Sequence, residues 1–406
     1  MKKSWIIVLL ASLVAVVGYV LWSLKDQELR FVPENADTVA LIDVKKLSQQ
    51  YSFTLAKHPS KWFGTQAHSV QKNGIKIPDY IQVFHLQNTG FNQWYSIFDI
   101  SDKDELLSFL QSNGFKISKN NTYTKAPFSV KMDGSRVVVG LAHKDFEKVT
   151  DGLAHSQTKS LYADQLIHHS VASVSYLAKS KIFNFAVYLN DDQIQIKTET
   201  ADDKFSSMAS DLDKTTAFLK LNLDATHTKM TALLVNKKWN DSLGIHSVAA
   251  VAELEIVNDK IITYGYDDNF NAVEKVSDQK IIQPNYNISL QSSDAEKTWS
   301  HFVNKKWINT QNQFTAIPFQ PNVIQKNGNK ISIKSKRKEL DFGKSSSGNY
   351  IFIKNNALLL NSVKSLSSRE KQALAAINYV FYGNKADSYD LTVQFKKETL
   401  PLILRW

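Results

Sequence analysis

Residues 94–114, WYSIFDISDKDELLSFLQSNG, set the expectation for the fold. The first seven are mostly aromatic or β-branched, which is typical of a strand. Ser101 and Asp104 then have the spacing of a capping box, in which a hydroxyl and an acid three residues later begin a helix. Leucines follow at helical spacing, and Gly114 suits the end of a helix. The stretch predicts a strand that leads directly into a capped helix.

The next elements extend this pair to the order βαββαβ. Apolar residues alternate on both sides of Asp133-Gly134, a two-residue signal for a β-hairpin turn. Apolar positions in 146–153 predict a short helix, and VASVSYL at 171–177 predicts a further strand.

The same register recurs near the C-terminus. YNISL at 286–290 predicts a strand, and a capping-box pattern follows it. A hairpin around Asn355-Asn356, a helix that is capped by Ser367 and Glu370 and includes Phe381, and the strand SYDLTVQF complete the order. At one constant offset, Ser101, Asp104, Leu107, Leu110 and Phe115 match Ser293, Glu296, Trp299, Phe302 and Trp307. We therefore expect an internal duplication.

The expected fold class is α+β, with an N-terminal transmembrane helix followed by two duplicated ferredoxin-like (βαββαβ) lobes joined by antiparallel strands. The expected boundaries are 1–30 for the cytoplasmic start and anchor, 31–180 for the first lobe, 181–280 for the central antiparallel strands, and 281–406 for the second lobe with an insert at 311–348. TALLV at 231–235 is one of the expected central strands.

An uncharged apolar run, SWIIVLLASLVAVVGYVLWSL at residues 4–24, follows Met1-Lys2-Lys3. About 20 apolar residues in a helix span the hydrocarbon core of a bilayer. The lysines before the run favour a cytoplasmic N-terminus and an exported, periplasmic body. A cleaved signal peptide is the alternative, but its apolar core is usually about 7–15 residues long and ends in small residues. We expect a single-pass anchor in the bacterial inner membrane.

Composition limits the function classes. The chain has 406 residues, no cysteine and a net charge of +10. The absence of cysteine excludes disulfides, thiol catalysis and cysteine-ligated metals. An exported body rarely meets nucleic acid, so we expect no nucleic-acid partner. An anionic envelope surface is the expected counterpart of the positive charge.

Residues 31–47, FVPENADTVALIDVKKL, carry a family resemblance. Pro33, Ala36, Val39 and Lys46 make this segment similar to the opening of uncharacterised, membrane-anchored, exported bacterial envelope proteins, which begin with a Pro-x-x-Ala-x-x-Val phrase. The resemblance implies an envelope location and agrees with a two-lobed α+β body. Related proteins are often lipoproteins, a feature this chain lacks because it has no cysteine. The resemblance implies no activity.

Sequence motifs do not indicate catalysis, a metal or a cofactor. His168 and His169 are adjacent, so they point apart on a regular element, and no H-E-x-x-H motif occurs. The acidic pairs at 191–192, 202–203 and 267–268 sit in turn-like contexts, where Asp is favoured for local backbone hydrogen bonds. We expect a protein that is not an enzyme and has no catalytic residue, metal or cofactor.

The insert contains the one candidate binding patch. Lys330, Lys334, Lys336 and Lys338 share one parity, so on a strand they would point to one face. Such a face suits anionic envelope lipid, lipopolysaccharide or an acidic envelope protein. A charged edge strand that prevents aggregation is the competing interpretation.

Three function hypotheses follow. The first is a non-enzymatic, membrane-anchored envelope protein with an exported binding or scaffolding body. The second is a hydrolase acting on an envelope polymer. The third is a sensor or assembly partner of another membrane protein, because Ala11, Ala15 and Gly18 form a small-residue stripe on the apolar segment.

Overall fold

The computed structural model divides into two compact units. Unit 1 comprises residues 1–191 and 399–406, and unit 2 comprises residues 192–398. The described residues are 25–62, 73–118, 120–178, 181–199, 204–234, 241–319, 321–343, 348–362 and 367–405. The predicted membrane segment, residues 4–24, lies outside them. Within the described ranges, no helix is both long and apolar enough to cross a membrane.

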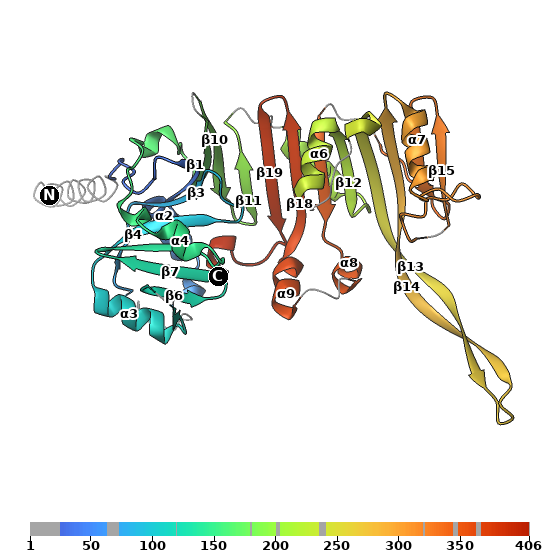
Figure 1. Ribbon diagram of the computed structural model, residues 1–406, viewed down its shortest axis with the longest axis horizontal. Helices are drawn as coiled ribbons and strands as arrows, with labels where there is room; N and C mark the ends of the chain where they lie inside the picture. The colour runs from blue at the N-terminus through green and yellow to red at the C-terminus, as the bar shows by residue number, and fades with distance from the viewer. Residues whose placement is uncertain are drawn as a thin grey trace, which may run out of the picture. The chain divides into compact units, whose positions relative to one another are not determined.

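Unit 1 is built on an antiparallel sheet. Its neighbouring strands run β10–β9–β1–β3–β4–β8–β7–β6–β5, and the short β2 also pairs with β4 (Figure 1). The strands are β1 (Ala36–Asp43), β2 (Ile75–Lys76), β3 (Tyr80–Leu86), β4 (Trp94–Ile100), β5 (Lys116–Ile117), β6 (Thr122–Lys125), β7 (Phe128–Asp133), β8 (Arg136–Leu141), β9 (Ala172–Leu177) and β10 (Ile182–Leu189). The helices are α2 (Val44–Ala56), α3 (Lys103–Ser112) and α4 (Phe146–Thr150), with short 3₁₀ turns η1 (Pro59–Lys61), η2 (Leu153–His155), η3 (Ala163–Gln165) and η5 (Leu402–Leu404).

Unit 2 is a second antiparallel sheet, in the order β11–β19–β18–β17–β12–β13–β14–β16–β15. The strands are β11 (Gln193–Lys197), β12 (Leu219–Asp224), β13 (Ile245–Tyr266), β14 (Ala272–Ser292), β15 (Asn322–Asn327), β16 (Lys330–Ser335), β17 (Asn349–Lys354), β18 (Ile377–Lys385) and β19 (Ser388–Phe395). The helices are α5 (Lys204–Asp213), α6 (Ala225–Leu234), α7 (Ala295–Asn304), α8 (Ala357–Ser362) and α9 (Ser368–Ala376), with a 3₁₀ turn η4 (Asp241–Leu243).

The predicted fold class is wrong, because the described chain forms large antiparallel sheets and not two ferredoxin-like lobes. A ferredoxin-like unit that began at β4 would place its last strand, β9, beside β4. In the structure β9 pairs with β1 and β10, while β3 and β8 occupy the two edges of β4. The physical reason is β3, whose alternate residues are buried and which fills the edge that β9 would need.

Several elements of the predicted second copy also differ. Residues 357–362 form helix α8 instead of the return strand of a hairpin, and residues 377–385 form strand β18 instead of continuing a helix. The buried residues of β18 alternate, so the period that decides its structure is that of a strand. The capping box of Ser367 and Glu370 at the start of α9 is confirmed.

The two units nevertheless share part of their topology. Unit 1 contains the order β1–α2–β3–β4–α3–β7–β8, and unit 2 contains β12–α6–β13–β14–α7–β15–β16. The pairing is β1–β3–β4–β8–β7 in one and β12–β13–β14–β16–β15 in the other. Ser101 N donates to Gly74 O and Ser293 N to Gly244 O, each over 2.9 Å. The register match in the sequence thus corresponds to two helices that begin in the same way, within a different fold from the one expected.

Candidate functional site

An apolar cavity of about 560 Å³, about half open to solvent, lies in unit 1 between helix α3 and strands β7 and β8. Phe109 and Leu110 line it from the helix, and Phe128, Val130 and Val139 line it from the strands. Phe128 is 47% exposed, so the cavity has an apolar rim as well as an apolar interior. Cavities of roughly 300–1,000 Å³ with this lining are typical of small-molecule sites.

The start of α3 holds the helix over the sheet. Asp102 is the N-cap, because its carboxylate accepts hydrogen bonds from the backbone N–H groups of Asp104 and Glu105, both over 2.9 Å. The sequence predicted Ser101 in this role, and that assignment is wrong by one residue. Leu106 and Leu110 then pack into a buried cluster with Val137. The cavity lies along the side of the helix next to this cluster.

The polar groups around the cavity are few. Asn113 Nδ2 donates to Phe109 O over 2.8 Å, and Asn73 Oδ1 accepts from Ile75 N over 3.2 Å. Both amides therefore serve the local backbone. Lys125, at the end of β6, is exposed and lines the cavity. Within the described part of the chain it forms no ion pair, so its ammonium group can receive an anionic end of a ligand.

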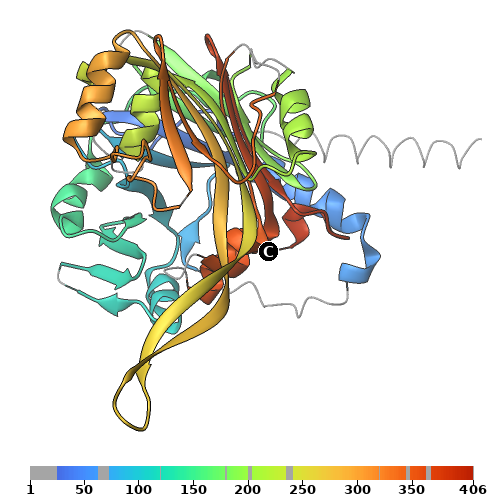
Figure 2. The ribbon, with the colours of Figure 1, turned by 90° about the vertical axis from the view of Figure 1, so that its right-hand side faces the viewer.

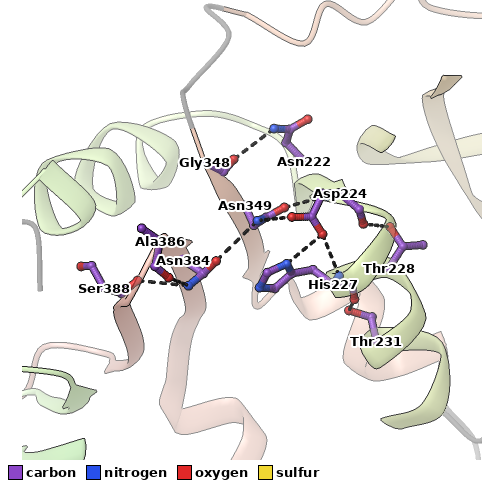
Figure 3. A network of polar contacts seen from close by, with 10 residues as sticks. All are labelled: Asn222, Asp224, His227, Thr228, Thr231, Gly348, Asn349, Asn384, Ala386 and Ser388. Atoms are coloured by element: carbon purple, nitrogen blue, oxygen red, sulfur yellow. Dashed lines mark hydrogen bonds and ion pairs between the residues drawn. The ribbon is translucent and has the colours of Figure 1, made fainter. Parts of the chain in front are cut away.

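A polar network in unit 2 is the strongest candidate for chemistry (Figure 3). The Asp224 carboxylate accepts from the backbone N–H of His227 over 2.8 Å, from His227 Nδ1 over 2.9 Å and from Asn349 Nδ2 over 2.9 Å. Burial raises the pKa of Asp224, but the hydrogen bonds from His227 and Asn349 outweigh burial, so the pKa lies below its usual value. The aspartate is therefore ionised and holds the imidazole in one orientation.

The surrounding groups make this network structural. Thr228 and Thr231, the hydroxyls nearest the pair in Figure 3, donate to the backbone carbonyls of Asp224 and His227 over 2.6 and 2.8 Å. A nucleophile would need its proton directed at the imidazole, with the base oriented by a third group. Both hydroxyls therefore serve the helix backbone, and Asp224 caps the start of α6 by accepting from His227 N.

The rest of the network joins the ends of three strands. Asn222 Nδ2 donates to Gly348 O over 3.1 Å, and Asn384 Nδ2 donates to Ala386 O over 2.9 Å. Asn222 is on β12, Asn349 on β17 and Asn384 on β18, and Figure 3 shows the 3.5 Å contact between Asn349 Nδ2 and Asn384 Oδ1. Asn222 and Asn384 satisfy backbone carbonyls where the strands end, which explains their presence without a ligand.

Among the residues that the structure describes, no three or more His, Cys, Asp or Glu side chains lie close enough together to hold a metal ion. His143 Nε2 lies 2.8 Å from the Tyr95 hydroxyl. Burial lowers the pKa of His143, with a smaller opposing effect from Asp145, and burial raises the pKa of Tyr95 to about 12. The pair is a neutral hydrogen bond at the edge of the core.

The predicted lysine patch lies only partly on one strand. Lys330 and Lys334 are on β16, whose opposite face is buried, whereas Lys336 and Lys338 follow the end of the strand. Strand β16 pairs with both β14 and β15, so it is not an edge strand. Lys334 Nζ lies 3.5 Å from Glu339 Oε1, and Lys338 forms an ion pair with Glu253.

The cavity beside α3 has no signal of its own in the sequence. Its lining residues appear there only as the apolar faces of one helix and one hairpin, and nothing in the sequence separates a filled interface from one with space in it. No protein-family model matches the chain, and no curated protein or solved structure matches it.

Proposed function

We propose that this is a non-enzymatic binding protein whose unit 1 takes up one apolar chain with an anionic end, such as a fatty acid. The observation that carries the proposal is the cavity beside α3, with Phe109, Phe128 and Val139 in its lining and Lys125 at its rim. A linear acyl chain fits an apolar space with one cationic group, and no arrangement for cleaving a bond accompanies it among the described residues.

The energetics of this ligand are favourable. Each buried methylene group contributes roughly 0.8 kcal/mol. A chain that buries about eight such groups would gain roughly 6 kcal/mol before the cost of immobilisation. The exposed ammonium of Lys125 adds at most about 1 kcal/mol, because water screens it. Affinity therefore depends on chain length, and Lys125 selects the charge of the end group.

The proposed location is the bacterial cell envelope. The support is in the sequence, where residues 4–24 form an uncharged apolar run behind two lysines. Such a segment would hold the protein in the inner membrane and place the body on the exported side. There the body would meet lipids and acyl chains that leave the bilayer.

The test is displacement of a fluorescent fatty acid from the purified full chain in a non-ionic detergent below its micellar concentration, or in nanodiscs. We expect dodecanoate to compete, and its affinity to fall at least tenfold in Val139→Phe, because the added ring fills the cavity. Lys125→Gln should weaken the binding of dodecanoate but leave the binding of its methyl ester unchanged. Lys116→Gln is the matched control, since Lys116 is an exposed lysine of the neighbouring β5 and does not line the cavity.

Equal binding by Val139→Phe and the wild type, at equal thermal stability, would show that dodecanoate binds elsewhere and would refute the proposal. Equal weakening by Lys125→Gln and Lys116→Gln would remove the specific role of Lys125. Failure of dodecanoate, its ester and longer acids to displace the probe would refute acyl binding altogether.

A further inference from the structure

A two-stranded arm extends from the sheet of unit 2. Strand β13 pairs with β12 only up to Ala252, and β14 pairs with β16 only from Asn287 onward. Beyond these residues β13 and β14 pair with each other, out to Tyr266 and Ala272. We call residues 256–282 the arm; at about 3.3 Å per residue it is roughly 35 Å long. Figures 1 and 2 show the twisted ribbon leaving its sheet.

The arm exposes large apolar side chains. Tyr264 and Tyr266 are 72% and 75% exposed, and Ile262 and Val276, which face each other across the ribbon, are 53% and 54% exposed. An isolated two-stranded hairpin is marginally stable in water. Glu274 lies opposite Tyr264 on the same face, and the Lys260–Asp278 pair lies on that face nearer the base. The outer half of the ribbon therefore has an exposed apolar patch beside Glu274, a surface that association would stabilise.

The tip of the arm has a defined conformation that presents Phe270. Asp267 Oδ1 accepts from the backbone N–H groups of Asn269 and Asn271 over 2.9 and 2.8 Å, and Phe270 N donates to Asp267 O over 3.0 Å. Phe270 is 84% exposed, and its φ of 61° places its backbone in the left-handed region. Such a backbone is unusual for a bulky residue and persists where the surrounding bonds impose it.

Charge differs between the two ends of the arm. The tip carries Asp267 and Asp268, and Lys260 faces Asp278 midway along the ribbon. The base is flanked by the basic segment 334–338. Three of the four cations of this segment already pair with glutamates: Lys334 with Glu339 at 3.5 Å, Arg337 with Glu255 at 3.9 Å, and Lys338 with Glu253. Lys336 is exposed and forms no ion pair with any residue in the described ranges.

We propose that two copies of this chain associate through their arms, packed antiparallel so that the acidic tip of each arm lies against the basic base of the other. Two-fold packing brings the opposite charges together and places Lys260 of one copy near Asp278 of the other. An acidic tip is unsuited to an anionic membrane surface, which favours a protein occupant. The two-fold dimer is also the commonest symmetric assembly.

The area fits a dimer of moderate affinity. A buried aromatic side chain covers roughly 150–250 Å². Tyr264, Tyr266 and Phe270 each supply somewhat less than this, because part of each ring already contacts the arm, and Ile262 and Val276 add to the total. The sum approaches the roughly 800 Å² per partner of a standard interface.

The first test is the mass of the full chain in detergent, by light scattering across a concentration series. We expect a monomer–dimer equilibrium, with the dissociation constant raised at least tenfold in the triple variant Tyr264→Ser, Tyr266→Ser, Phe270→Ser. The matched control is Phe91→Ser, because Phe91 is 81% exposed but lies in unit 1. A monomer at every concentration would overturn the proposal, as would equal weakening by the control.

The second test uses the absence of cysteine from the chain, which makes introduced cysteines unique. Ile262→Cys, near the middle of the arm, should crosslink to itself under oxidation. Asp268→Cys and Lys336→Cys should crosslink when the two variants are mixed, and Asp268→Cys alone should not. Self-crosslinking of Asp268→Cys would show parallel arms and refute the arrangement. Binding of the arm to phosphatidylglycerol vesicles without any dimer would overturn the proposal and assign the arm to a membrane instead.

Discussion

Gly74 should be one of the least replaceable residues of unit 1, and Gly74→Ala tests how the start of α3 is held. Gly74 has a φ of 66°, and a Cβ added there would lie 2.2 Å from Asp102 O and 2.4 Å from Leu106 N. Both contacts are backbone atoms at the first turn of α3, so no side-chain rotation relieves them. The helix or the loop must move.

The magnitude follows from three contributions. A left-handed backbone costs an L-residue about 1–2 kcal/mol. Overpacking against fixed atoms adds about 1–3 kcal/mol. Movement of the loop also weakens the hydrogen bonds that Ser101 N and Asp102 N donate to Gly74 O, over 2.9 and 3.1 Å, each worth about 1 kcal/mol. We expect Gly74→Ala to lower the free energy of unfolding of unit 1 by about 4 kcal/mol.

Gly114→Ala is the matched control. Gly114 has a φ of 76°, and nothing lies within 4 Å of an added Cβ. Only the backbone contribution applies, and reduced freedom of the unfolded chain offsets part of it, so the expected loss is about 1 kcal/mol. Urea unfolding, followed by hydrogen exchange of the α3 amides, measures both variants. Equal losses for the two glycines would refute the reasoning that close approach fixes Gly74.

Two further predictions concern helix starts in unit 2. Asp294→Ala should lower the free energy of unfolding by about 1 kcal/mol, because the Asp294 carboxylate accepts from Lys297 N over 2.9 Å. Ser293→Ala should lower it by only about a few tenths of a kcal/mol. Equal shifts in melting temperature for the two variants would contradict the assignment of Asp294 as the cap. Asp224→Asn should reduce stability at neutral pH. Because the folded pKa of Asp224 is below its unfolded value, the ionised group stabilises the fold above the unfolded pKa and this contribution is lost as the pH falls through the folded pKa. The difference in free energy of unfolding between Asp224→Asn and the wild type should therefore shrink as the pH falls. A difference that stays constant with pH would contradict this prediction.

Local structure was largely readable from the sequence. The strand at 94–100, the helix after it and the hairpin around Asp133-Gly134 are present, because alternation, helical spacing and turn chemistry act over a few residues. The capping box at Ser367 was found for the same reason. At Ser101 and Ser293, which share one register in the sequence, the backbone N–H donates the same kind of hydrogen bond to a preceding glycine, although the predicted duplicated lobes are wrong.

Local preference was misleading where tertiary packing competed with it. Residues 377–385 carry a helical spacing of apolar residues, yet they form β18, in which Phe381 is fully buried between two pairing strands. Residues 231–234 were expected to be a strand and belong to α6. In both cases the neighbouring elements decide which period is used: β18 pairs with β17 and β19, and α6 contacts β12 and β13.

The sequence by itself determined the apolar run at 4–24, the absence of cysteine chemistry, the basic charge and the positions of most strands and turns, because these depend on composition and short-range pattern. Only the tertiary structure decided which strands pair. Either edge of β4 or β18 offers backbone groups that could pair with several strands, and the choice depends on which faces of the sheet become buried. The tertiary structure also decided that space remains beside α3 and that β13 and β14 run on beyond their neighbours as an arm. Both features depend on where packing stops, which no local pattern encodes.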